Sequence, residues 1–186
     1  MVANVTALNV TVKDNTAFAI NVTDDFKGNV SIKVGDKVLY NGSVKTLINA
    51  AQLTADEYTA EVVFYGDDNY NKLTLDNVKF NVTKVTPAIV VSIDDVTYPD
   101  NAVAIINVDN KANGTVKITV GTKVFDTTVS NGVGNVDLIG LSAGSKVAAV
   151  EFTSTDDYNF DATATTKFTV NKANSTVVIG VEDYYL

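Results

Sequence analysis

The chain has 186 residues, of which 46% are hydrophobic, a net charge of −8 at pH 7, and no Cys, His, Trp or Arg. These absences exclude disulfides, thiolate metal sites and histidine-based catalysis, and they predict no organic cofactor. The acidic charge without Arg predicts no nucleic-acid partner, and no apolar run reaches the ~18 residues of a membrane span, which predicts no membrane insertion.

The first part of the chain, up to residue 84, is predicted to form a series of short strands. Val and Thr are the commonest residues, and β-branched side chains favour a pleated sheet. Apolar and polar residues alternate with a period of two, which predicts strands near residues 7–13, 17–23, 28–34, 37–41, 43–49, 57–65 and 75–84. Gly35-Asp36 and Asn41-Gly42 lie between predicted strands, and both pairs are typical of two-residue hairpin turns.

The second part of the chain repeats the first. Gly28–Val38 returns 86 residues later as Gly114–Val124, and further along the shift is 88 residues. Strands are predicted near residues 88–94, 102–108, 114–120, 122–129, 133–139, 146–154 and 162–171, with turns at Gly121-Thr122 and Asn131-Gly132. About seven strands per repeat predict an all-β chain of two tandem β-sandwiches, residues 1–86 and 87–174.

Two further features lie where the repeats end. The junction at Pro87 has no Gly or Ser tract, and proline fixes its own φ, which predicts a short and stiff connector. Thr176–Asp183 matches Ala88–Asp95 at the 88-residue shift, so we expect residues 175–186 to be the opening strand of a third repeat. This match favours an excerpt from a longer array, or a strand that is donated to a neighbouring molecule.

Several of these segments together carry a family resemblance. A Gly-Thr-Val-Lys-Ile-Thr-Val strand leads into a Gly turn, an Asn-Gly turn, Leu-Ser-Ala-Gly at 141–144, an Asp-Asn-Tyr-Asn loop and a closing strand. This pattern resembles the bacterial-type immunoglobulin-like repeats, group 3, of adhesin-like surface proteins, particularly those of methanogenic archaea. The resemblance implies an immunoglobulin-like fold, a cell-surface or extracellular location and a role in cell adhesion. The first repeat departs from the pattern at Leu53–Asp56, where a Gly is commoner in the family.

The predicted function is that of a non-enzymatic spacer in an extracellular adhesin-like protein, whose stacked modules give reach and stiffness. Its partners are then neighbouring repeats or identical subunits. Two alternatives remain open. One is a filament subunit that assembles by β-strand donation through residues 176–183. The other is an adhesive module whose end loops bind glycans or proteins of a host cell or cell wall.

Two acidic loops are the candidate metal sites. Alternating oxygen ligands of the kind found in calcium loops are present at Asp67, Asn69, Asn71, Asp157, Asn159 and Asp161. The sixth position of a calcium loop requires Gly, and Lys72 and Ala162 stand there. The alternative is a tight loop in which Asp and Asn side chains cap backbone amides.

Asn-X-Ser/Thr sequons are abundant in this chain. They make eight asparagines candidates for glycosylation in an extracellular protein: Asn4, Asn9, Asn21, Asn29, Asn41, Asn81, Asn113 and Asn174.

Overall fold

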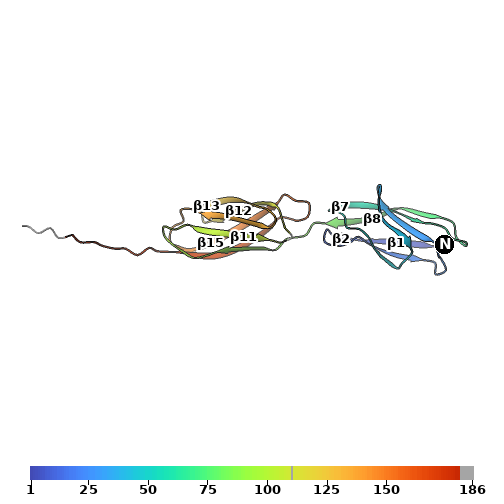
Figure 1. Cartoon of the computed structure of the whole chain (residues 1–186), viewed down its shortest axis with the longest axis horizontal. Helices are drawn as coiled ribbons and strands as arrows, with labels where there is room; N and C mark the ends of the chain where they lie inside the picture. Colours follow the sequence, from blue (N-terminus) through green and yellow to red (C-terminus); the bar gives the residue numbers. More distant parts are fainter. Residues whose placement is uncertain (110, 181–186) are drawn as a thin grey trace, which may run out of the picture. The chain divides into compact units, whose positions relative to one another are not determined.

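The structure, a computed structural model, describes residues 1–109 and 111–180 (Figure 1). These residues form strands and no helix, which confirms the all-β prediction, and none of them belongs to a helix that could cross a membrane. Contacts divide the chain into two compact units. The first unit comprises Met1–Thr86 with Asp156–Phe160, and the second comprises Pro87–Thr155 with Asp161–Leu186.

The first unit is built from two sheets. One sheet has the order β1-β3-β6 and the other has the order β2-β8-β7-β4-β5. The strands are β1 (Ala3–Leu8), β2 (Val10–Thr11), β3 (Ala17–Val22), β4 (Asn29–Val34), β5 (Lys37–Ser43), β6 (Leu47–Asn49), β7 (Asp56–Phe64) and β8 (Leu73–Thr83).

The second unit has the same topology strand for strand. Its sheets have the orders β14-β11-β9 and β10-β16-β15-β12-β13. The strands are β9 (Ile89–Ile93), β10 (Val96–Thr97), β11 (Ala102–Val108), β12 (Gly114–Val120), β13 (Lys123–Val129), β14 (Val133–Leu138), β15 (Gly144–Ser154) and β16 (Ala162–Asn171). Each unit is therefore an immunoglobulin-like β-sandwich, as predicted, with three strands in one layer and five in the other.

The first strand of each unit is split between the two sheets. In the first unit β1 pairs antiparallel with β3, and β2 pairs in parallel with β8. The prediction of one strand over residues 7–13 was therefore wrong, because alternate burial begins at Ala3 and pairing is broken at Asn9. At this break the side chain of Asn9 accepts a hydrogen bond from the Asn81 amide, with 2.8 Å between Oδ1 and N.

The second unit repeats this break with a different residue. Asp95 lies between β9 and β10, and its Oδ1 accepts a hydrogen bond from the Thr169 amide at 2.6 Å. A side chain thus replaces a missing backbone acceptor where the strand leaves one sheet for the other, which keeps the strand's neighbour hydrogen-bonded.

Three of the four predicted turns are confirmed, and the fourth is not. Gly35 and Gly121 occupy the tight β4–β5 and β12–β13 turns with φ of 52° and 61°, as predicted. Asn131 and Gly132 also form a turn, with φ of 52° and 85°. The prediction for Asn41-Gly42 was wrong, because β5 continues through both residues, which pair with Ser31 and Val30 of β4.

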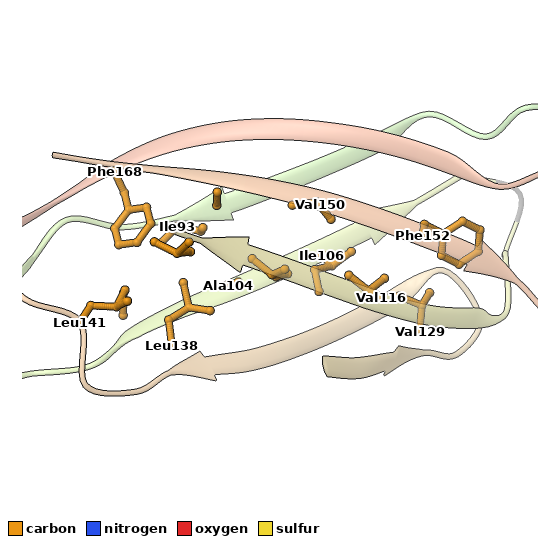
Figure 2. Close-up of a cluster of buried hydrophobic side chains, with 14 of the residues drawn as sticks. Ile93, Ala104, Ile106, Val116, Val129, Leu138, Leu141, Val150, Phe152 and Phe168 are labelled. Carbon is orange, nitrogen blue, oxygen red and sulfur yellow. The ribbon is translucent and has the colours of Figure 1, made fainter. Parts of the chain in front are cut away.

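Each unit has a hydrophobic core of its own. In the second unit, shown in Figure 2, Phe152 lies near Val116 and Val129, whereas Phe168 lies near Ile93. The core of the first unit is richer in aromatic side chains. Phe18 packs edge-on against Phe80 with 5.4 Å between ring centroids, and Phe26 packs edge-on against Phe64 at 6.0 Å.

The segment expected to open a third repeat has no strand partner in the part that the structure describes. Residues 172–180 lie outside the strands, and Val177, Val178 and Ile179 are exposed. Residues 181–186 of that predicted strand lie outside the described residues.

Candidate functional site

The loop between β7 and β8 is organised by the carboxylate of Asp67. Its Oδ1 accepts hydrogen bonds from the amides of Asn69 and Tyr70, both at 2.9 Å. Its Oδ2 accepts one from the amide of Lys27 at 2.7 Å, which joins this loop to the one that follows β3. The hydrogen bond from Lys27 is the main reason why the pKa of Asp67 lies below its ordinary value.

A second side-chain bond ties the same two loops together. The hydroxyl of Tyr70 donates to Oδ1 of Asp25 at 2.7 Å, and this bond raises the pKa of the phenol. The ring of Tyr70 lies 6.3 Å from that of Phe26, so it packs inward over the core. Asp68 and Asn69, by contrast, are exposed at the tip of the loop.

In the corresponding segment of the other repeat, Asp156 takes the role of Asp67. Its Oδ1 accepts hydrogen bonds from the amides of Tyr158 and Asn159 at 2.9 and 2.7 Å. Asp156 was absent from the predicted site residues because the alternating pattern of Asp157, Asn159 and Asp161 passes over it, and the sequence repeat places Asp68, not Asp67, opposite it. A bulge between β7 and β8 changes the register of the first loop by one residue, whereas β15 and β16 pair without a break.

The side chains of three candidate calcium ligands, Asp67, Asn159 and Asp161, form hydrogen bonds within the protein. Both carboxylate oxygens of Asp67 are taken by backbone amides, Asn159 is buried against Asp156, and Oδ1 of Asp161 accepts from the amide of Ser154 at 2.8 Å. Asn69, Asn71 and Asp157 are exposed. Residues 1–109 and 111–180 contain no group of three or more Asp or Glu side chains able to hold a metal ion. The loops thus do what the capping alternative describes, and calcium binding stays a prediction.

All eight sequon asparagines have exposed side chains, as a glycan attachment site requires. Asn4 and Asn21 lie directly opposite each other on β1 and β3. Asn9 and Asn113 also have structural roles, since Oδ1 of each accepts a backbone amide, from Asn81 and Asn131 respectively. Glycosylation replaces a hydrogen on the amide nitrogen, so it leaves those oxygen acceptors in place. The other four candidates are Asn29, Asn41, Asn81 and Asn174.

A pocket lies at the β4–β5 end of the first unit, and an equivalent pocket lies at the β12–β13 end of the second. The first is lined by Val12, Val34, Lys37, Gln52, Leu53, Thr54, Tyr58, Asp157 and Tyr158. The second is lined by Val120, Gly121, Thr122, Lys123, Gly140, Leu141, Ser142 and Lys146. Sequence analysis did not find these pockets, because their residues come from turns and strand ends that are far apart in the sequence.

No protein-family model matches the chain, and no curated protein matches it. Among solved structures it is similar to the fibronectin(III)-like modules of Clostridium thermocellum CbhA, with 12% identity and a TM-score of 0.37 over 97% of this chain and 100% of that one. It is also similar to the Yersinia pseudotuberculosis adhesin InvE, with 12% identity and a TM-score of 0.38 over 91% of this chain and 58% of that one.

A third similar structure is the Bacteroides ovatus mixed-linkage glucan utilization protein SGBP-B in complex with a heptasaccharide. The identity is 15% and the TM-score 0.33, over 90% of this chain and 42% of that one. Similarities this low say nothing about the ligand or the activity of the present chain.

Proposed function

We propose that this chain is a non-enzymatic spacer segment of an extracellular, adhesin-like surface protein. The observation that carries the proposal is the repetition of one self-contained sandwich: the two units share their strand order and bury separate cores. A domain with its own core is stable without its neighbours, so further copies lengthen the protein without new chemistry. The connector at Pro87 is short, and proline restricts its backbone.

The acidic side chains of the described residues support a structural role. Asp14, Asp67, Asp95 and Asp161 each accept at least one backbone amide. A carboxylate used in this way stabilises a turn, or the break at which the first strand of a unit passes from one sheet to the other. It has less capacity left to bind a substrate or a metal ion.

The exposed sequons support an extracellular setting, because N-linked glycans are attached to accessible asparagines of secreted proteins. We expect native material to carry glycan on one or more of these residues, and peptide mapping of protein isolated from its own organism would detect it. An intact mass equal to that of the bare polypeptide would contradict this part of the proposal.

Surface labelling of intact cells tests the proposal directly. Antibodies raised against the folded chain should label unpermeabilised cells of the organism that makes it, and external protease should remove the signal. A cytoplasmic protein of the same cells, detected only after permeabilisation, serves as the control. Labelling of this chain only after permeabilisation would overturn the proposal.

A further inference from the structure

Four of the sequons in the first unit form two close pairs. Asn4 on β1 lies directly opposite Asn21 on β3, and both side chains are exposed on the face of the sheet that points away from the core. Asn9 and Asn81 form the second pair, because Oδ1 of Asn9 accepts a hydrogen bond from the Asn81 amide at 2.8 Å. The members of each pair are far apart in the sequence, so it is the folded unit that brings them together.

We propose that each pair carries a single N-linked glycan in the folded protein, so that modification of one member excludes modification of the other. The inference rests on the proposed extracellular function, because N-linked glycans are attached to secreted chains. It deepens that function by setting how many glycans these four sequons carry, which the sequence alone does not determine.

The chemistry of the modification explains why close acceptors compete. A bond forms between Nδ2 of the asparagine and the anomeric carbon of a glycan that is activated as a glycosyl phosphate. The bond from that carbon to the phosphate oxygen breaks, the phosphate leaves with the electron pair, and Nδ2 loses one proton to water. The transferring enzyme must therefore reach the second Nδ2 past a glycan that is already attached to the first.

At the first pair, a sugar on one asparagine covers the other. Directly opposite residues have Cβ atoms about 4.5–5.5 Å apart, and a pyranose ring with its substituents is about as wide as this spacing. The next residues along the same face, Thr6 and Ala19, have short side chains and also lie opposite each other. A sugar attached to Asn4 can therefore lie across both strands, and it then occupies the space over Asn21.

At the second pair, one groove serves both acceptors. Asn9 lies at the break between β1 and β2, Asn81 lies on β8, and the groove that they line is completed by Glu57, Thr59 and Lys79 among others. The carboxylate, hydroxyl and ammonium groups of these three side chains can form hydrogen bonds with sugar hydroxyls. A sugar attached to either asparagine is therefore held in the groove, where it blocks the other asparagine.

The second unit lacks all four of these sequons. Its corresponding positions hold other residues at three places, and at the fourth an asparagine with no Ser or Thr two residues later: Val90, Asp95, Thr169 and Asn107. Asp95 keeps the acceptor role of Asn9 with a side chain that cannot carry an N-linked glycan. Folding therefore requires an acceptor at this break and does not require a sequon there, which leaves the sequon at Asn9 to be explained by a second role.

Secretion of the full chain from a eukaryotic cell line that attaches N-linked glycans tests the proposal. Intact mass and glycopeptide mapping of the folded, secreted protein should show chains with a glycan on one member of a pair and none with a glycan on both. Asn4→Gln or Asn21→Gln, whichever removes the more occupied member, should raise the occupancy of the other about twofold or more, because the space between them is no longer shared.

The matched control is Asn29→Gln, which removes a sequon of the same unit on β4, in the other sheet, and should leave the occupancy of both pairs unchanged. Glycans on both members of either pair in one folded chain would overturn the proposal. So would the absence of glycan from all four asparagines. These results come from a different cell, so they do not depend on where the organism places the protein, whereas failure of the surface labelling of intact cells would overturn the proposed spacer function.

Discussion

The two units reach the same topology with different core side chains, and the difference is compensated locally. In the first unit Ala7 of β1 lies opposite Phe18 of β3, whereas in the second unit Ile93 of β9 lies opposite Ala104 of β11. The large residue has moved from one strand to its neighbour. Figure 2 shows Ile93 beside Ala104 in the second core.

This exchange shows which properties of the core the fold requires and which can vary. Cores tolerate hydrophobic substitutions when the total volume is retained and the alternation of the strands is kept. Alternate burial is regular in β11 and β12, and the turns at Gly35 and Gly121 are the same in both units. The strand pattern and the turns therefore determine the sandwich, while the position of each large side chain can vary.

We expect the largest loss of stability when the large residue of one of these pairs is removed without a compensating change in its partner. Phe18 is fully buried, so Phe18→Ala should destabilise the first unit by about 3–5 kcal/mol through the cavity it leaves. Adding Ala7→Ile to that variant should recover part of the loss, since it reproduces the pair found in the second unit. Denaturant unfolding of the single and double variants measures both effects.

The matched control is the reverse exchange. Ala104→Phe should overpack the second unit by about 1–3 kcal/mol, and Ile93→Ala should relieve this strain. If Ala7→Ile recovers no stability in the Phe18→Ala background, the proposed volume compensation between β1 and β3 is wrong.

A smaller effect is expected at a position that both units keep as Gly. A methyl group on Gly114 would meet the carbonyl oxygen of Thr153 and the ring of Phe152, and one on Gly28 would meet Tyr65 and Phe26. Gly114→Ala and Gly28→Ala should therefore each cost about 1–3 kcal/mol, measured as a loss of unfolding free energy. Equal stability of these variants and the wild type would show that the strands can separate without cost.

Removing the side-chain acceptor at the break in the first strand of either unit should lower the unfolding free energy by about 1 kcal/mol, the usual contribution of one hydrogen bond. Asn9→Ala and Asp95→Ala each remove the acceptor for an amide of the last strand, Asn81 or Thr169. Amide hydrogen exchange should become faster at the affected amide in each variant. Unchanged protection of both amides would contradict the proposed role of these side chains.

The smallest effect is a change in acid stability that is confined to the first unit. Folding lowers the pKa of Asp67, so the stability this group contributes is present above its unfolded pKa of about 3.9 and is lost as pH falls through the lower folded value. Asp67→Asn should reduce stability at neutral pH and flatten its decline with acid. An acid-unfolding curve with the same slope in wild type and variant would contradict this assignment.

The sequence predicted the two sandwiches and most strands, because alternation and turn residues are local properties. Strands such as Gly114–Val120 were placed correctly from that pattern alone. Asn41-Gly42 was misassigned since its turn preference is overridden by pairing with β4, which is a tertiary effect. Asn9 accepts a hydrogen bond from the amide of Asn81, 72 residues further along the chain, so no local pattern could reveal its role. Asp156 caps amides only two and three residues away, and it was missed because the alternating pattern of oxygen ligands passes over it.

Mechanical unfolding of single molecules of the full chain is the most direct test of two self-contained units. The account predicts two separate unfolding events per molecule. Each should release on the order of 280–320 Å of extended chain, less the end-to-end length of the folded unit, because a repeat of 86 or 88 residues extends by about 3.3–3.6 Å per residue. It also predicts that Phe18→Ala lowers the unfolding force of one event and leaves the other unchanged. A single event that releases the whole chain, or a shift of both events by that one substitution, would contradict the account.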